Sequence, residues 1–225
     1  MSKRTLHAVL HASELLTGAG VRAKDGRQVT ESDLGRISDG ALVYEPRGKV
    51  VWVGPTKKLP RALLKEVPAK RRVDLGQAQT IVPGFVDCHT HLVFAGDREN
   101  EFAARCAGAT YQEIAASGGG IMATVRSTRN ATAAELEHLA AARVEESAHF
   151  GVRTFEIKSG YGLSVEAELK SLEVIRRLKK RFPQYTFHAT FLGAHAFPPE
   201  YPRDVYLKLL TEMLLPQIAK KKLAD

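Results

Sequence analysis

The stretch that most constrains this chain is residues 81–94, which read IVPGFVDCHTHLVF. Its apolar, β-rich beginning predicts a strand, and side chains two residues apart project from the same face of a strand. His89 and His91 would therefore point to one place, and Cys88 and Thr90 to the other side. Neutral imidazole is a common protein ligand of zinc and iron. The spacing alone also fits the plainer alternative of a half-buried polar patch on a strand.

After this run, predicted strands alternate with predicted helices, which is typical of parallel βα units. Thr132 with Glu135 three residues later forms a capping-box pattern, which predicts a helix that ends before Gly151. Ser164 begins another helix, whose apolar positions fall on one face. The expected strands are residues 153–158 and 185–192, and the last expected helix is residues 204–221.

The connection between the first and second of these strands, residues 95–131, is long. We expect one short helix in it, at residues 111–116, followed by the three glycines Gly118 to Gly120. No Gly-Lys-Ser/Thr follows them at the required spacing, so they are not a phosphate-binding loop. Long βα connections border the active site in barrel enzymes, so this one is a candidate wall or lid.

Residues 1–80 predict a separate small β unit. Glycines and prolines punctuate short β-rich runs, as they do between the strands of a sheet. No residue in this unit has an evident chemical task. The expected strands are residues 5–10, 40–43, 49–53 and 72–75, with a helix at residues 60–66.

Composition narrows the classes of partner. With 44% hydrophobic and 26% charged residues, the 225-residue chain has the balance of a soluble globular protein. It has neither the roughly 20-residue apolar run of a membrane helix nor the pattern of a secretory signal. Cys88 and Cys106 form no disulfide framework, so we expect reduced thiols and a cytoplasmic location. The net charge is +8, but the basic clusters lie at helix ends without interleaved aromatics, so we expect neither a nucleic-acid nor a membrane partner.

The motifs resemble a known group of enzymes. PGFVDCHTH is similar to the first barrel strand of the amidohydrolase superfamily, and FAGDRENEF, KSGYGL and FLGAHA together resemble the imidazolonepropionase family. The resemblance implies an α/β fold, an incomplete (β/α)8 TIM-type barrel preceded by a small β-sandwich-like domain. Residues 1–80 would be the small domain, normally completed by C-terminal segments, and residues 81–225 would be the first three βα units of the barrel.

The resemblance also implies roles for five residues. His89 and His91 would bind one divalent metal ion, zinc or iron. Arg98, Tyr161 and His195 would bind a small substrate that carries a carboxylate. The residue types suit these tasks, because a guanidinium can grip a carboxylate with two hydrogen bonds. Plainer alternatives are an ion pair of Arg98 with Asp97 or Glu99, a turn tyrosine packed on a neighbour, and a structural histidine.

The implied reaction is hydrolysis of 4-imidazolone-5-propanoate to N-formimidoyl-L-glutamate, a step of histidine degradation. A (β/α)8 barrel takes about 250 residues, whereas residues 81–225 number 145. The remaining metal ligands and the acid/base residue would lie beyond residue 225, and no catalytic residue is located within the chain. Three alternatives stay open. The chain could be a truncated non-catalytic fragment, a complementing half, or an amidohydrolase for another cyclic amide or a deamination. Expected protein partners are a second copy or a complementing C-terminal half.

Overall fold

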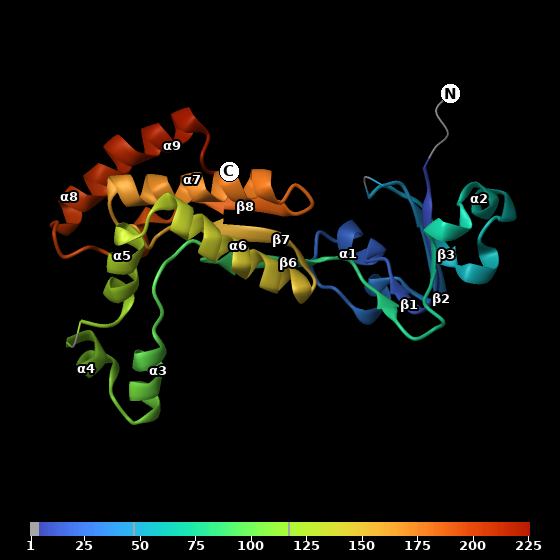
Figure 1. The fold of residues 1–225 in the computed structure, drawn as a ribbon, viewed down its shortest axis with the longest axis horizontal. Helices are drawn as coiled ribbons and strands as arrows, with labels where there is room; N and C mark the ends of the chain where they lie inside the picture. Colours follow the sequence, from blue (N-terminus) through green and yellow to red (C-terminus); the bar gives the residue numbers. More distant parts are fainter. Residues whose placement is uncertain (1–4, 47, 117) are drawn as a thin grey trace. The chain divides into compact units, whose positions relative to one another are not determined.

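Two units, each with its own core, make up the chain: Met1–Pro83 and Gly84–Asp225. The computed structural model describes residues 5–46, 48–116 and 118–225. The first unit is blue to teal in Figure 1, and the second runs from green to red. None of the described helices is both long enough and apolar enough to cross a lipid bilayer.

The first unit is built around one mixed β-sheet with the order β3-β2-β1-β4, in which β5 also pairs with β1. The pairs β1–β2 and β2–β3 are antiparallel, and β4 and β5 run parallel to β1. A register shift between Val9 and Ala12 lets β1 continue past the expected end of its strand. The strands are β1 (His7–Leu16), β2 (Arg36–Tyr44), β3 (Val50–Pro55), β4 (Arg72–Asp74) and β5 (Thr80–Ile81).

The described residues of this unit form a single sheet, in which β4 and β5 both pair with β1, at successive registers, and so extend one sheet. The small β-sandwich-like domain, completed by C-terminal segments, stays a prediction. Helix α2 (Arg61–Glu66) contributes Leu63 and Leu64 to the small core on the sheet. The other helical segments are α1 (Ala19–Ala23), η1 (Glu31–Leu34), η2 (Thr56–Lys58) and η3 (Ala69–Arg71).

The second unit has a parallel three-stranded sheet with the order β6-β7-β8. Its strands are β6 (Phe85–Thr90), β7 (Val152–Lys158) and β8 (Thr186–Thr190). Helix α6 (Ala133–His149) precedes β7, and helix α7 (Val165–Arg181) connects β7 to β8 (Figure 1). The expected alternation of parallel strands and helices is therefore confirmed, whereas closure into a barrel stays a prediction.

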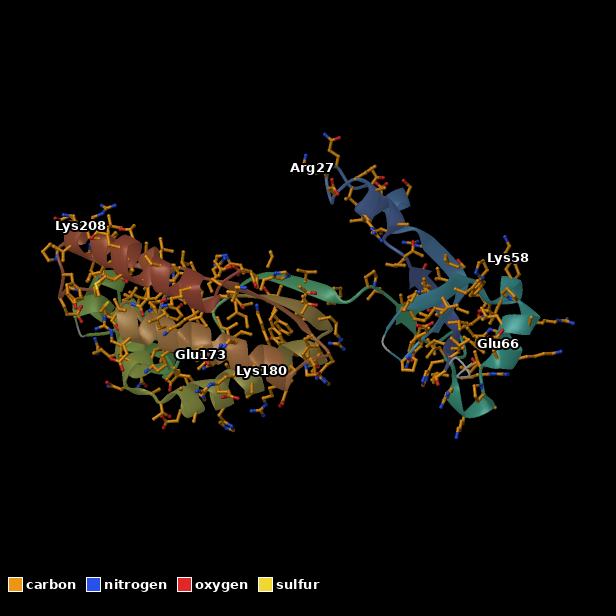
Figure 2. All side chains as sticks on the ribbon, turned by 90° about the horizontal axis from the view of Figure 1, so that it is seen from above. Arg27, Lys58, Glu66, Glu173, Lys180 and Lys208 are labelled. Atoms are coloured by element: carbon orange, nitrogen blue, oxygen red, sulfur yellow. The ribbon has the colours of Figure 1, made fainter. Side chains whose placement is uncertain are left out.

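Alternation along the strands separates the two faces of this sheet. Phe155 and Ile157 on β7 are fully buried against the helices, while Glu156 and Lys158 point to the opposite face. Charged side chains of α7, such as Lys180, project away from the core (Figure 2). Helices α6, α7 and the C-terminal helices fill the core with Leu136, Val144, Leu172, Ile175, Leu178, Leu210, Leu214 and Ile218.

The described residues of the connection after β6 form three helices, where the sequence predicts one. Helix α4 (Tyr111–Ala116) lies where it is expected, and α3 (Glu99–Cys106) and α5 (Ile121–Asn130) are additional. The three helices lead the chain from the end of β6 to α6 (Figure 1).

The last expected helix is also more complex. It comprises α8 (Arg203–Lys208), the π-helical segment η5 (Leu209–Leu214) and α9 (Leu215–Lys221). Pro216 stands at the start of α9. Because proline has no N–H and its ring crowds the carbonyl four residues earlier, the regular helical hydrogen bonds cannot run through it. The wider π-turn is the local accommodation.

The run at residues 81–94 forms a shorter strand than the sequence predicts. β6 begins at Phe85 and ends at Thr90, so His91 lies just beyond it. The pairing with β7 also shifts register between Asp87 and Thr90. His91 is therefore not a position of the regular strand, as the sequence predicts it to be, and the two histidines are not equivalent positions.

Candidate functional site

His89 and His91 occupy different environments although one residue separates them. His89 is exposed, whereas His91 is half-buried, and the centres of their rings are 6.0 Å apart. Burial, and next the nearby His195 imidazole, lower the pKa of His91 to about 4. His91 is therefore neutral near pH 7, which is the form in which imidazole binds metals.

Three of the five candidate residues lie together: His91, Tyr161 and His195. The ring of His195 stacks on that of His91 at 4.6 Å with an interplanar angle of 10°, and the ring of Tyr161 lies 4.7 Å from His91. Tyr161 and His195 are themselves 5.4 Å apart. The three residues follow β6, β7 and β8, so the carboxyl ends of three parallel strands place them together.

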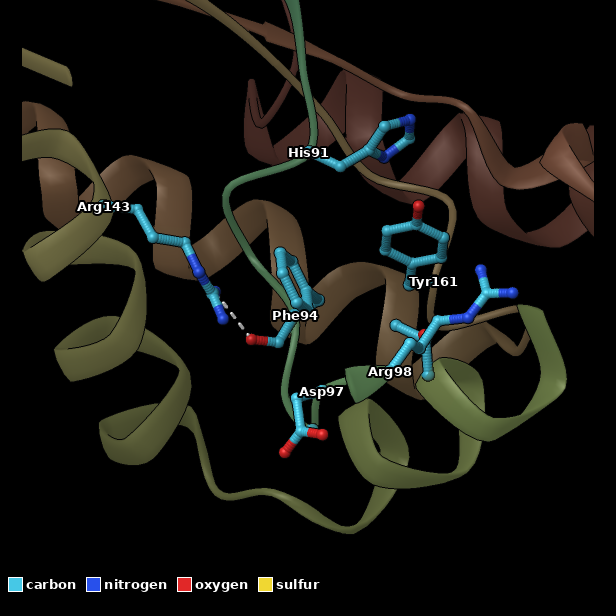
Figure 3. Close-up of a pocket in the computed structure, with 8 residues that line it drawn as sticks. His91, Phe94, Asp97, Arg98, Arg143 and Tyr161 are labelled. Atoms are coloured by element: carbon cyan, nitrogen blue, oxygen red, sulfur yellow. Dashed lines mark hydrogen bonds between the residues drawn. The ribbon is translucent and has the colours of Figure 1, made fainter. Parts of the chain in front are cut away.

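A cavity of about 420 Å³ opens beside this cluster (Figure 3). That volume is within the usual range for small-molecule sites. In Figure 3 the hydroxyl of Tyr161 points toward His91. Arg98 lies on the wall of the same cavity, which is lined by His91, Phe94, Gly96, Asp97, Arg98, Thr124, Arg143 and Tyr161.

Arg98 stands at the N-terminal end of α3 and forms an ion pair with Glu101. Its Nε and Nη2 donate to the Glu101 carboxylate at 2.7 and 2.5 Å. The other oxygen of Glu101 accepts from the Gly120 N–H at 2.9 Å. Glu101 thus ties the Arg98 side chain to the beginning of α5 and fixes its place on the cavity wall.

Arg143 and Phe94 line the cavity but were not candidates from the sequence. Nη1 of Arg143 donates to the carbonyls of Leu92 and Phe94 at 2.7 and 2.8 Å. The guanidinium carbon also lies 3.6 Å from the centre of the Phe94 ring, in a cation–π contact. Arg143 follows buried Leu136 by seven residues, or about two helical turns, and so shares the core-facing side of α6. A charged residue at such a position was the feature of the sequence that could have identified Arg143 as a candidate.

Glu156 and Lys158 form a charged pair on the polar face of β7. Lys158 Nζ lies 2.5 Å from Glu156 Oε1, and neither side chain is more than one-fifth exposed. Burial, the largest single influence, raises the pKa of Glu156, but the hydrogen bonds from Lys158 and Thr190 and the nearby charges of Lys158 and His89 together outweigh it and lower the pKa overall. Lys158 is the first residue of the KSGYGL motif, and its ion pair with Glu156 compensates its charge.

The two histidines fit part of a metal site. His91 Nδ1 is buried and has no hydrogen-bond partner in the described part of the chain, as a nitrogen reserved for a ligand would. With zinc–nitrogen bonds of about 2.1 Å at the tetrahedral angle, the ring centres of two imidazoles on one ion lie about 5.3 Å apart, and those of His89 and His91 are 6.0 Å apart, slightly wider. Among the described residues no group of three potential ligands lies together, whereas a catalytic zinc site has three protein ligands.

Curated relatives align with nearly the whole chain. The imidazolonepropionase of Bdellovibrio bacteriovorus is 46% identical over 213 residues, which cover 94% of this chain and 49% of the relative. That of Symbiobacterium thermophilum is 47% identical and covers 94% and 48%. That of Cupriavidus metallidurans is 50% identical over 191 residues, covering 84% and 44%. The chain spans about half the length of the curated relatives it matches.

Solved structures are more distantly similar. Ochratoxinase of A. niger has a TM-score of 0.49 at 16% identity and covers 84% of this chain and 31% of its own. An uncharacterized metal-dependent hydrolase from Pyrococcus furiosus has a TM-score of 0.48 at 13% identity, covering 83% and 50%. TM-scores below 0.5 do not establish a shared fold. No family model matches the chain.

Proposed function

The chain is homologous to imidazolonepropionases over 94% of its residues, and we propose that it forms the N-terminal part of such a metal-dependent hydrolase. The proposed reaction opens a ring C–N bond of 4-imidazolone-5-propanoate to give N-formimidoyl-L-glutamate. The proposed location is the cytoplasm. About half of each relative has no counterpart in the 225 residues. The activity is therefore proposed for a site that combines these residues with further residues from the rest of such a hydrolase.

One observation carries the proposal. His91, Tyr161 and His195, from three separate strand ends, bring their rings into contact beside a small-molecule cavity that Arg98 also lines. Residues up to 104 positions apart in the chain meet there, since 195 minus 91 is 104. Each of them is a residue that the sequence motifs single out for the substrate or the metal.

The chain's own residues have distinct proposed tasks. Arg98 binds the propionate carboxylate through charge-assisted hydrogen bonds. Tyr161 donates its hydroxyl proton in a hydrogen bond to the imidazolone ring, and His195 contacts the ring from the carboxyl end of the neighbouring strand β8. Phe94, held by Arg143, forms an apolar wall for the flat ring.

His89 and His91 are the proposed holders of a zinc or iron ion. When bound, such an ion would act as a Lewis acid, which would polarise the ring carbonyl and lower the pKa of the attacking water toward about 7. The low pKa of His91 keeps its imidazole available as a ligand at neutral pH. Further ligands and the acid/base residue come, in this proposal, from a part of the protein outside these 225 residues.

The half-length match favours a second candidate function, that of a complementing half without activity of its own. In that case the chain would bind part of the metal and substrate and gain turnover only with a C-terminal partner. The coverage of 48–49% of the longer-matching relatives is the observation that supports it.

The ring-opening assay distinguishes these candidates. The zinc- or iron-loaded chain is tested alone and with the separately produced C-terminal half of the B. bacteriovorus relative. Turnover of imidazolonepropionate by the chain alone supports an independent enzyme, and turnover only in the mixture supports a complementing half. If neither preparation turns over while the intact relative does, the chain is a non-catalytic fragment and the proposed function is wrong.

Substrate class is tested in whichever preparation is active. Arg98→Ala should lower kcat/KM for imidazolonepropionate about 10- to 100-fold, because a hydrogen bond to a charged group contributes about 1.5–3 kcal/mol. Turnover of an uncharged cyclic amide should not change. Arg105→Ala, an exposed arginine of the same helix, is the matched control. Equal losses on both substrates would contradict the role of Arg98 in binding the carboxylate.

A further inference from the structure

The loop that carries Tyr161, residues 159–163, has a backbone that needs outside support. Gly160 has φ +115° and Leu163 has φ +47°. Leu163 is not a glycine, and side-chain-bearing residues seldom adopt the left-handed region unless their surroundings enforce it. Leu163 is also fully buried.

The carboxylate of Glu168 holds the N–H side of the loop. Glu168 lies in the first turns of α7 and is 0% exposed. Its Oε1 accepts from the N–H of Gly162 at 2.8 Å and from the N–H of Leu163 at 2.9 Å. The loop runs so close to α7 that a Cβ on Gly162 would lie 2.6 Å from the Glu168 nitrogen.

The guanidinium of Arg129 holds the carbonyl side of the same two residues. From the last turn of α5, its Nε donates to the Gly162 carbonyl at 2.7 Å and its Nη2 to the Leu163 carbonyl at 2.8 Å. Its Nη1 donates to Glu200 at 2.5 Å. The carbonyl of Arg129 itself accepts from Lys170 Nζ of α7 at 2.8 Å, which anchors the end of α5.

The same loop lies directly against His195. A Cβ on Gly160 would come within 2.9 Å of the His195 Cβ and 2.7 Å of the Leu192 carbonyl. In addition, Ser159 accepts from the Leu192 N–H at 3.1 Å. A displacement of the loop would therefore move Tyr161 relative to both His195 and His91.

We propose that Arg129 and Glu168 are positioning residues, which grip opposite sides of the Gly162 and Leu163 backbone and so fix the Tyr161 ring against His91 and His195. The inference rests on the proposed function for the task of Tyr161, but the positioning itself does not depend on turnover. A buried carboxylate is unfavourable unless its hydrogen bonds are specific. Glu168 shares the core-facing side of α7 with Leu172 and Ile175, where an apolar residue would pack without that cost.

The test uses NMR of the imidazole C–H signals of His91 and His195 in the metal-free, substrate-free 225-residue chain. Tyr161→Leu, which removes the aromatic ring, defines the shift expected when the ring contact is lost. Arg129→Met and Glu168→Leu should move both histidine signals most of the way toward their positions in Tyr161→Leu. Glu168→Gln keeps an acceptor oxygen and should leave them near the wild-type positions.

Glu166→Gln is the matched control, since Glu166 is an exposed carboxylate in the same first turn of α7. The side chain of Arg129 is partly exposed in the wild type, so we expect the Arg129→Met variant to fold. The proposal is overturned if this folded variant keeps the wild-type histidine signals. It is also overturned if Tyr161→Leu itself leaves them unmoved. Absence of turnover with correctly shifted signals would count against the proposed function alone.

Discussion

At the scale of single residues, His91 is the centre of the candidate site. Its ring contacts Tyr161 and His195, and its buried Nδ1 has no partner among the described residues. His89 is exposed, and what links it to the candidate site is its closeness to His91, since the centres of the two rings are 6.0 Å apart. The His-x-His pattern could be read from the sequence, but the unequal burial depends on β7 and β8, which lie far away along the chain.

We predict that His89 and His91 are both needed for Zn²⁺ binding by the metal-free chain. His89→Ala and His91→Ala should each weaken binding in isothermal titration by more than about tenfold, because ligand loss costs more than loss of the groups that orient a ligand. His138→Ala, an exposed histidine on α6 outside the cavity of Figure 3, should bind like the wild type. Equal affinity in all variants would contradict the assignment.

A second prediction at this scale concerns Asp33 in the first unit. Hydrogen bonds from the Lys24 ammonium and from Thr30 lower the pKa of Asp33 from 3.8 to about 2. A carboxyl whose pKa is lower in the folded state stabilises the fold above its ordinary pKa, and this contribution is lost as pH falls toward the folded value. We therefore expect Asp33→Asn to reduce the loss of unfolding free energy between about pH 4 and about pH 2.

The measurement is urea unfolding followed by the fluorescence of Trp52. This is the one tryptophan of the sequence and packs on the core of the first unit. Asp25→Asn, a substitution in an exposed turn of the same unit, serves as the control and should keep the wild-type pH profile. A variant profile that parallels the wild type at every pH would show that Asp33 does not carry the effect.

At the scale of elements, the sequence predicted the helix starts that a capping side chain marks. The Thr132 capping box placed the start of α6, and Ser164 placed the start of α7, where its side chain accepts from the Ala167 N–H. Helix α3 was missed because none of its residues is buried, so no apolar stripe marks it. Helix α5 was missed because Ile121, Thr124, Val125 and Thr128 give it a strand-like composition.

The candidate site was predictable only where a motif names the residue. Arg98, Tyr161 and His195 lie in motifs, and the structure brings them to one region with His91. Arg143 and Glu168 lie inside helices, and what they contact depends on long-range folding. The early end of β6 was not predictable either, because the register shift is a property of its pairing with β7.

The capping box of α6 provides a prediction of element stability. Thr132 Oγ1 accepts from the Glu135 N–H at 3.2 Å, and the Glu135 carboxylate accepts from the Thr132 N–H at 2.7 Å. Thr132→Ala should lower the free energy of unfolding of the second unit by about 1 kcal/mol. Urea unfolding monitored by circular dichroism measures it. Thr132→Ser retains the acceptor and should stay close to the wild type, and an equal loss in both variants would contradict the cap.

At the scale of the whole molecule, the parallel sheet ends at β6 and at β8 within the described residues. An unpaired strand with apolar side chains is a surface on which other chains can pair. On β6, Phe85 is 56% exposed and Val86 is 64% exposed, which is unusual for two adjacent residues of a strand that begins beside a core. Since the chain spans about half of its relatives' length, we propose that a counterpart of the relatives' other half pairs with this edge.

We therefore predict that the isolated chain self-associates through β6. In sedimentation velocity, its average sedimentation coefficient should rise with concentration. The double variant Phe85→Thr and Val86→Thr should reduce that rise, since threonine retains a preference for strands but exposes less apolar surface. Phe150→Thr is the matched control, because Phe150 is a 71% exposed aromatic at the end of α6 rather than on the strand.

Adding the C-terminal half of the B. bacteriovorus relative tests whether that half binds to the edge of β6. If that half occupies the edge, it should suppress self-association of the wild-type chain and form a heterodimer that the double variant forms more weakly. The edge of β6 is not the contact surface if the double variant and the wild type self-associate equally and the added half changes the concentration dependence of neither. Association would then have to be sought on another exposed apolar surface, such as the one around Met213 and Leu215.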